Sequence, residues 1–184
     1  MVSRLVVASF TEDLSWLDEV KGWDVIVYQK NAIDPKLKFN QVLLPNVGRE
    51  THTFLHHLFL GDDADRIAFV QGNPFDHDKF FLKHINSDLI DSNISPVYRC
   101  LGNGEPDTSI LDVDNLHLNL FGEIQKQYKF AQGAMNVVSQ TSVKKRNRIF
   151  WKRCLELLLE NPNVRGHEFE RSWGYIFDLK YATD

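Results

Sequence analysis

The sequence predicts an α/β protein, built as a three-layer sandwich with a mostly parallel mixed sheet. Apolar, β-branched runs at residues 4–10, 23–29 and 66–70 predict three buried strands. Apolar residues at helical spacing between and after these runs predict helices. Strands that alternate with helices along a chain favour parallel pairing, with helices covering both faces of the sheet.

The first half of the chain supports this pattern element by element. The strand at residues 4–10 ends at an acidic cap, residues 11–13, which begins a short helix that reaches residue 20. After the second strand and a polar loop, residues 42–44 predict a short extended piece. A turn then leads to a helix at residues 50–60, which has leucines and a phenylalanine on its apolar side.

The second half is less regular. The strand at residues 66–70 runs into an acidic turn, and a short helix follows near residues 80–85. Residues 86–123 contain several glycines and prolines and predict loops. The later elements that we expect are a strand near residues 97–101, a strand with a glycine kink at residues 130–139, and helices at residues 141–160 and 167–177.

Length and composition bound the class of protein. The 184 residues fit one domain, and a composition of 43% hydrophobic and 25% charged residues suits a chain that buries a real core. The net charge of −4 gives no general attraction to nucleic acid, so we expect no nucleic-acid partner. Cys100 and Cys154 stand alone and predict neither a disulfide framework nor a zinc ribbon. We read no signal peptide and no apolar run near the ~20 residues that span a bilayer, and expect a soluble, cytoplasmic protein without a transmembrane segment.

Three loops leave the predicted strands at one edge of the sheet. They cover residues 9–13, 45–50 and 71–78. Ligands of open α/β sheets bind just beyond the carboxyl ends of the strands. The sequence therefore predicts that these loops meet around one binding site.

The last of these loops holds two carboxylates, Asp76 and Asp78, one residue apart. In an extended turn, side chains two apart point to the same side, and two carboxylates so placed suit a divalent cation. The alternative is a helix start, with Asn73 as the N-cap, Pro74 at the first position and both carboxylates near the positive end of the helix dipole. On a helix, residues two apart do not face each other, so the pair would not share one ion.

Three other features are candidates for chemistry. Arg49 follows Gly48 at a helix start and suits a phosphate, or it is a surface arginine after a turn. His52 and His56 have the spacing of a zinc helix, but Thr53 stands where the catalytic glutamate of such a helix belongs, so packed histidines are the alternative. Glu170, three residues before an aromatic side chain, suits a general base with a raised pKa, or it pairs with an arginine.

Several stretches together resemble a family of uncharacterised proteins that is known mainly from fungi and other microbes. In that family a strand ends in Tyr-Asn-Glu-Asp-x-x-Trp-Leu, and the motifs Leu-Pro-Asn-x-Gly-Arg-Glu-x-His-x-Tyr-Leu-x-His, Gln-Gly-x-Pro-x-Asp-His and Glu-Arg-x-Trp follow. The corresponding segments here are residues 10–17, 45–57, 71–77 and 170–173, which together span almost the whole chain. Phe10 stands where the family has the tyrosine of the first motif.

The order of these parts also resembles a minimal GT-A glycosyltransferase, including small ones encoded by large algal viruses. This resemblance implies one GT-A-like domain over residues 1–184, with a nucleotide-binding half at about residues 1–80 and an acceptor-binding half at about residues 81–184. The residues that it implies for the nucleotide are Phe10, Glu12, Asp13, Arg49 and Gln71.

The same resemblance implies roles for carboxylates in both halves. Asp76 and Asp78 would hold Mn²⁺ or Mg²⁺ against the diphosphate, although five residues separate them from the strand that the family's Asp-x-Asp follows directly. Glu170 is the first candidate for the catalytic carboxylate and Glu168 the second.

The function expected from the sequence is metal-assisted transfer of a sugar, from a nucleotide-sugar such as a UDP-sugar to a hydroxyl of a glycan or protein-glycan acceptor. Two alternatives remain open. One is a metal-dependent phosphoesterase built from residues 76–78 and the face that carries His52 and His56. The other is a non-catalytic binding module, which predicts no ordered pocket at the three loops.

Overall fold

The computed structural model describes residues 1–94, 97–101, 111–125 and 127–179. Its main sheet has the strand order β3-β2-β1-β4-β8-β5. The first four strands in that order run parallel, and β8 is antiparallel to both of its neighbours. The strands are β1 (Ser3–Ser9), β2 (Asp24–Gln29), β3 (Asn40–Leu43), β4 (Arg66–Gln71), β5 (Ser92–Asn93) and β8 (Asn136–Ser139).

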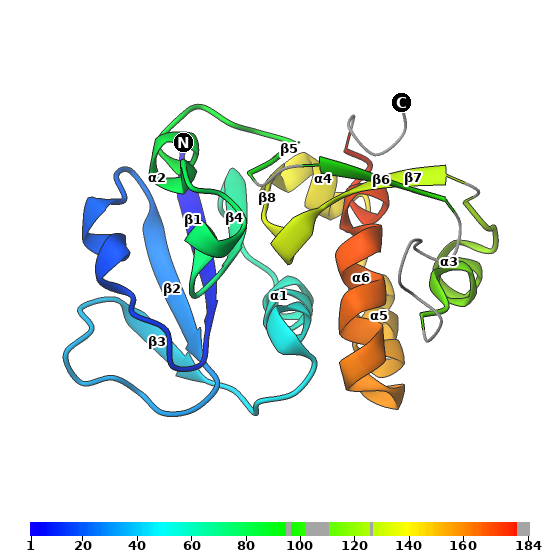
Figure 1. Ribbon diagram of the computed structural model, residues 1–184, viewed down its shortest axis with the longest axis horizontal. Coiled ribbons are helices and arrows are strands. Elements are labelled where there is room, and N and C mark those ends of the chain that lie inside the picture. Colours follow the sequence, from blue (N-terminus) through cyan, green and yellow to red (C-terminus); the bar gives the residue numbers. More distant parts are fainter. Residues whose placement is uncertain (95–96, 102–110, 126, 180–184) are drawn as a thin grey trace.

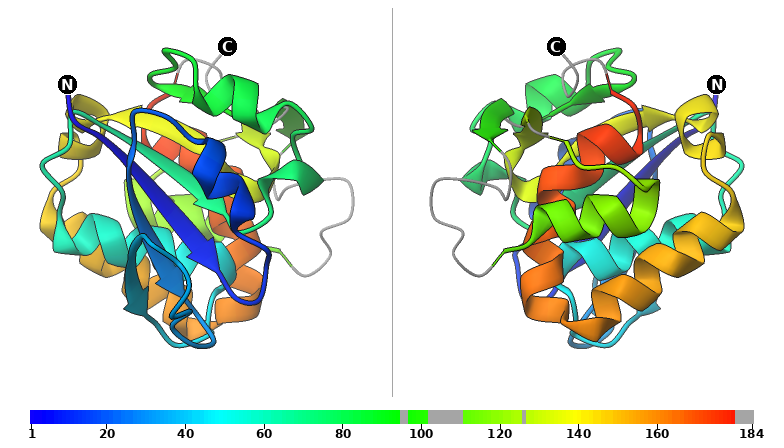
Figure 2. Two further views of the ribbon diagram at one scale, coloured as in Figure 1. Left: turned by 90° about the vertical axis from the view of Figure 1, so that its left-hand side faces the viewer. Right: turned by 90° about the vertical axis from the view of Figure 1, so that its right-hand side faces the viewer.

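Helices cover both faces of this sheet. On one face lie α1 (Arg49–Leu60), α5 (Arg148–Glu160) and α6 (Pro162–Ile176), as Figure 1 shows. Further out, α3 (Val113–Phe121) packs on α6 and α5 (Figure 2). The other face is covered by a 3-10 helix, Ser15–Glu19, and by α2 (Phe81–Ile85). The smaller elements are α4 (Gln140–Lys144) and a two-stranded antiparallel ribbon of β6 (Val97–Leu101) and β7 (Gln127–Ala131) beside α6.

The central strand shows why the sequence adopts this architecture. Val6 of β1 packs into the core beneath α1, whereas Leu5 and Val7 pack into the core beneath the 3-10 helix, and all three side chains are fully buried. A strand that is buried on both faces must be apolar without alternation, which is the pattern of this segment. The structure therefore confirms the predicted α/β class and its mostly parallel mixed sheet between helical layers.

Three details differ from the sequence prediction. The strand expected over residues 130–139 is split into β7 and β8, because Gly133 and Ala134 take positive φ angles of 73° and 56° and turn the chain. The long helix expected over residues 141–160 is two helices, because the Asn147 side chain accepts a hydrogen bond from Phe150 N at 2.9 Å and starts a new one. In addition, α3 lies in a region that was expected to be irregular.

The strand order also indicates where this sheet would bind a ligand. The chain passes from β1 to β2 and β3 on one side, and then returns to place β4 on the other side of β1. The carboxyl ends of β1 and β4 thus flank the point where the winding direction reverses, and open α/β sheets bind ligands at that point. Within the described ranges, no helix is both long enough and apolar enough to cross a bilayer.

Candidate functional site

A cavity of about 310 Å³ opens at the carboxyl ends of β1 and β4. All three loops that were predicted to meet contribute to it, together with the end of β2. Its lining residues are Ala8, Ser9, Phe10, Glu12, Lys30, Asn46, Arg49, Glu50, Gln71, Asn73 and Asp76. The lining is polar and carries charges of both signs, so this cavity suits a charged ligand with several hydrogen-bonding groups.

Arg49 begins α1 at the cavity wall with its guanidinium about half exposed. Its φ angle is +54°, a left-handed conformation that is unfavourable for a residue with a side chain. Such strain persists only where the surroundings impose it, and it gathers at functional sites. The surroundings here include Lys30, whose Nζ donates hydrogen bonds to Val47 O at 2.7 Å and to Arg49 O.

Lys30 itself is nearly buried, with an exposed fraction of 7%. Burial lowers the pKa of its amine to about 8, and the nearby Glu50 opposes this shift. A neutral amine still has two N–H donors. Lys30 can therefore hold both carbonyl oxygens of the β3–α1 loop in either charge state.

Glu50 presents a largely buried carboxylate to the same cavity, with a side-chain exposure of 10%. Burial raises its pKa, although Arg49 at 3.5 Å and the residue's own backbone N–H act in the opposite direction. A carboxyl group that is desolvated in a polar cavity is a common feature of binding and catalytic sites. It suits a hydroxyl partner, such as those of a ribose or a sugar.

Phe10 and Glu12 form the β1 side of the cavity. Phe10 is 44% exposed, so its ring is available to a flat partner. The Glu12 carboxylate accepts hydrogen bonds from Ser9 Oγ at 3.0 Å and from Phe10 N at 2.6 Å. It also lies so close to Gly72 that a Cβ atom there would come within 2.5 Å of Glu12 Oε2. Glu12 thus shapes the turn after β1 and links it to the turn after β4.

Asp76 is the member of the predicted metal pair that reaches this cavity. It ends a short 3-10 helix, Pro74–Asp76, and its Oδ1 accepts a hydrogen bond from the Asn73 side chain at 2.8 Å. Gln71 also lines the cavity, and its side chain donates to Asn73 O at 2.8 Å. The wall after β4 therefore consists of one carboxylate and two amides.

Asp78 points elsewhere, and this corrects the expected ligand pair. Its side chain is 6% exposed, with one oxygen accepting from Phe80 N at 2.9 Å and the other 2.5 Å from His84 Nδ1. The helix-start alternative is met in part, because Pro74 begins a 3-10 helix, but that helix ends at Asp76 and the Asn73 side chain makes no cap hydrogen bond. Asp78 does not line the cavity that Asp76 lines, and in the described parts of the chain no group of three or more His, Cys, Asp and Glu side chains is arranged to hold a metal.

Asp13 is a second residue that the structure places outside this cavity. Its carboxylate accepts hydrogen bonds from Ser15 N at 2.9 Å and from Ser15 Oγ at 3.0 Å. These contacts hold the chain just before the 3-10 helix at Ser15–Glu19, and Asp13 lines two smaller hollows, one with Trp16 and Phe75 and one with Asp34.

The two candidate catalytic carboxylates differ sharply. Glu168 is 2% exposed, and its oxygens accept from Arg165 Nη1 and from Asp112 N, each at 2.7 Å. It is an internal tie between α6 and the start of α3. Glu170 does not line the cavity either, but its charge raises the pKa of Glu50, which does.

Glu170 is held by several donors. Its Oε1 accepts from Gly133 N at 2.6 Å, and its Oε2 accepts from Arg171 Nη1 at 3.4 Å. Burial on its own would raise the pKa of Glu170, but the nearby His167, the hydrogen bond from Gly133 N and the charge of Arg171 outweigh it and lower the pKa. The sequence expectation of a raised pKa is therefore wrong, and the arginine alternative is part of the reason.

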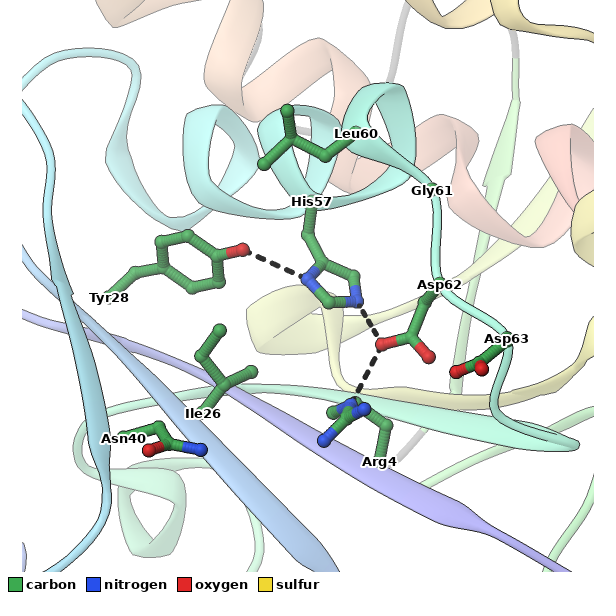
Figure 3. A pocket seen from close by; sticks show the side chains of 9 residues that line it. All are labelled: Arg4, Ile26, Tyr28, Asn40, His57, Leu60, Gly61, Asp62 and Asp63. Atoms are coloured by element: carbon green, nitrogen blue, oxygen red, sulfur yellow. Dashed lines mark hydrogen bonds and ion pairs between the residues drawn. The ribbon is translucent and has the colours of Figure 1, made fainter.

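A second cavity, of about 700 Å³, lies between α1 and the sheet (Figure 3). His57 points from α1 toward the sheet, between Tyr28 OH at 3.0 Å from its Nδ1 and Asp62 Oδ2 at 3.0 Å from its Nε2. Asp62 also accepts from Arg4 Nε at 2.8 Å and from Ala64 N at 2.7 Å. These groups lie away from the carboxyl ends of the strands, so we interpret this network as structural.

Among the residues that the structure describes, the histidine face of α1 belongs to no group of three or more side chains placed to hold a metal. His52 is 8% exposed, and its ring centroid lies 6.2 Å from that of His56, which in turn packs edge-on against Tyr28. Burial lowers the pKa of His52 to about 4. The alternative of packed histidines accounts for this geometry.

Sequence reasoning missed three residues of the site. Lys30 lines the cavity but lies at the start of a polar loop that contains no recognisable motif. Glu50 also lines it, but in the sequence the neighbouring Arg49 was the more obvious candidate. His167 contacts Arg49 Nη1 through its Nε2 at 3.4 Å, a pairing across 118 positions of the sequence. Only the spacing of His167 and Glu170 on one helix was a usable signal for the last of these.

A comparison of the chain with models of known protein families found no match. Searches against curated proteins and against solved structures found no match either.

Proposed function

We propose that this protein transfers a sugar from a nucleoside-diphosphate sugar, in the first instance a UDP-sugar, to a hydroxyl acceptor, and that its domain is of the GT-A type. The observation that carries the proposal is the polar cavity at the carboxyl ends of β1 and β4, where the sheet reverses its winding. Nucleotides bind at this point in doubly wound sheets.

The lining supports a nucleotide-sugar in particular. The exposed ring of Phe10 suits stacking on a base, and the buried Glu50 carboxylate suits the hydroxyl groups of a ribose. Arg49 can hold a phosphate with two parallel hydrogen bonds. The Gln71 and Asn73 amides at the end of β4 add further polar contacts.

The charges of the lining bear on the role of a metal ion. Two cations, Lys30 and Arg49, face the three carboxylates of Glu12, Glu50 and Asp76, so a diphosphate needs additional positive charge. Mg²⁺ is commonly bound by one or two carboxylates together with substrate phosphates, and Asp76 would take that role here. A bound Mn²⁺ or Mg²⁺ would offset charge on the leaving nucleoside diphosphate.

The alternatives gain less support. A phosphoesterase requires the carboxylates and histidines of residues 76–78 to converge with those of α1, and Asp78 is instead engaged with His84. A non-catalytic binding module predicts no ordered pocket at the three loops, which is where the cavity lies.

The test is a screen of UDP-, GDP-, ADP- and CMP-sugars by calorimetry, with Mn²⁺, with Mg²⁺ and with a chelator. We expect a UDP-sugar to bind with a metal ion and to release UDP slowly in the presence of simple glycoside acceptors. Arg49→Gly should weaken binding by at least about tenfold, since a charge-assisted contact of about 1.5–3 kcal/mol is lost. Glycine suits the positive φ at this position, so the fold should remain intact. Absence of binding by every nucleotide-sugar would refute the proposed function.

A further inference from the structure

His167 lies between the cavity wall and Glu170. Its Nε2 is 3.4 Å from Arg49 Nη1, and its Nδ1 is 3.9 Å from Glu170 Oε2. The side chain is 39% exposed, so the ring is accessible from solvent. An imidazole is thus held between a cation that lines the cavity and a buried carboxylate on its own helix.

These contacts select one protonation form of the ring. A guanidinium has donors and no acceptor, so Nε2 of His167 must be the acceptor in its contact with Arg49. The proton of the neutral ring then lies on Nδ1, facing Glu170. Glu170 Oε2 lies 3.9 Å from Nδ1, beyond hydrogen-bond distance, so the carboxylate favours a proton on that nitrogen through its charge and leaves the other nitrogen as a base.

Glu170 is poorly suited to accept a proton itself. Gly133 N and Arg171 Nη1 both donate to its carboxylate, and its pKa is lowered. A group that is stabilised as an anion orients a neighbour better than it abstracts a proton. A side chain that can act as the base is therefore better sought one helical turn earlier on α6, at residue 167.

We propose that His167 is the catalytic base, with Glu170 as its positioning residue; this inference rests on the proposed function. In the transfer step, the acceptor oxygen forms a bond to the anomeric carbon as the bond from that carbon to the diphosphate oxygen breaks. The leaving nucleoside diphosphate keeps the bonding electron pair. The proton of the acceptor hydroxyl passes to Nε2 of His167, and the ring later releases it to solvent.

Arg49 connects donor binding to this base. The guanidinium contacts Nε2 in the unliganded protein, and in the proposed complex it turns to the diphosphate. That movement frees the Nε2 lone pair for the acceptor hydroxyl. Charged groups that contact His167 or act on it include Arg49 and Glu50 on α1 and Glu170 and Arg171 on α6.

The first test compares four variants with the wild type, using UDP-glucose, UDP-galactose and UDP-N-acetylglucosamine as donors and methyl glycosides as acceptors. His167→Ala should lower kcat about a hundredfold or more while the Kd for the donor changes by less than about threefold. Added imidazole should restore part of the activity, which a purely structural role would not allow. Glu170→Gln should lower kcat less, and His167→Gln should resist rescue. Asn163→Ala, an exposed change on the same helix, is the control and should behave as the wild type.

The second test needs no turnover. Nitrogen-15 spectra of the His167 ring, recorded well above the imidazole pKa, should show the Nδ1–H tautomer in the wild type and a mixture in Arg49→Gly. An Nε2–H tautomer in the wild type would overturn the assignment of the base. The assignment would also be overturned if the wild type were active and the His167→Ala variant kept its kcat. In that case the proposed function would hold without this residue. A wild type that binds and turns over no nucleotide-sugar refutes the proposed function and the inference with it.

Discussion

The backbone N–H of Gly133 donates a hydrogen bond to Glu170 Oε1 at 2.6 Å, which fixes the carboxylate of α6 against the turn between β7 and β8. The turn can approach so closely because residue 133 has no side chain. A Cβ atom there would lie 2.5 Å from the Cδ2 atom of His77, and the φ angle is +73°. Gly133 thus sets the position of Glu170 and packs against the loop that carries Asp76.

Gly133→Ala should therefore be destabilising by about 2 kcal/mol, from the left-handed conformation and from the displacement of His77. Denaturant unfolding measures this change. Gly22→Ala is the matched control, since Gly22 has a φ of +77° with no atom near its Cβ position. The difference between the two variants isolates the steric contact. Equal losses of stability in both variants would contradict the close approach to His77.

Substitutions of Asp76 and Asp78 should have different effects, one on ligand affinity and the other on the free energy of unfolding. Asp76→Asn should weaken UDP-sugar binding in the presence of Mn²⁺ by about tenfold and leave the free energy of unfolding nearly unchanged. Asp78→Asn should instead lower stability by about 1–3 kcal/mol, because its buried carboxylate accepts from Phe80 N and faces His84. Calorimetric titration with a UDP-sugar measures the binding of both variants, and denaturant unfolding measures their stability. Loss of metal-dependent binding in Asp78→Asn without loss of stability would restore the paired-ligand hypothesis.

The network in Figure 3 predicts a pH dependence of stability that is set by Asp62. Burial would raise the pKa of Asp62, but hydrogen bonds from His57, Ala64 N and Arg4 outweigh it, and the pKa lies below its ordinary value of 3.8. A carboxyl group with a lowered pKa in the folded state stabilises the protein above the unfolded pKa, and this contribution is lost as the pH falls.

Asp62→Asn should consequently cost about 3 kcal/mol at neutral pH and should make unfolding less sensitive to acid. Unfolding by urea at a series of pH values measures both effects. The control is Asp24→Asn, which also removes a partner of Arg4 but at a largely exposed position, and it should cost under about 1 kcal/mol. A similar loss of stability in both variants would show that burial of Asp62 does not matter.

His117 predicts a second pH dependence, at less acid values. Its side chain is fully buried, and burial lowers its pKa from 6.5 to about 4. The unfolded chain then binds a proton that the folded chain excludes, so stability is complete above the unfolded pKa and falls as the pH falls toward the folded pKa. The loss from this residue should reach about 2 kcal/mol at about pH 5. His117→Gln should flatten this part of the stability curve, and an unchanged slope would contradict the assignment.

Much of the fold was predictable because its signals are local. The strands at the centre of the sheet are apolar on both faces, and Leu5, Val6 and Val7 show it within three consecutive residues. The division of one predicted strand and of one predicted helix in the second half was missed, because each division depends on a single residue. Gly133 turns one predicted strand into two, and Asn147 starts a second helix inside a stretch that reads as one continuous helix.

The site was predictable in its place and less so in its details. Parallel strands bring their carboxyl ends to one edge, so the three loops converge as expected. Side-chain direction depends on contacts that the sequence does not display. Asp78 is turned toward His84, and Glu168 is tied to Arg165, by neighbours that only the folded chain provides. His167 became visible as a partner of Arg49 for the same reason.

The account as a whole depends on a nucleotide occupying the cavity between β1 and β4. Backbone amide NMR spectra of the protein with Mg²⁺, recorded before and after the addition of UDP, test this most directly. We predict that the signals that shift come from residues 9–12, 46–50 and 71–76, while those around Asp62 in the other cavity stay in place. Spectra that do not change, or changes that gather around Asp62 and His57, would contradict the account.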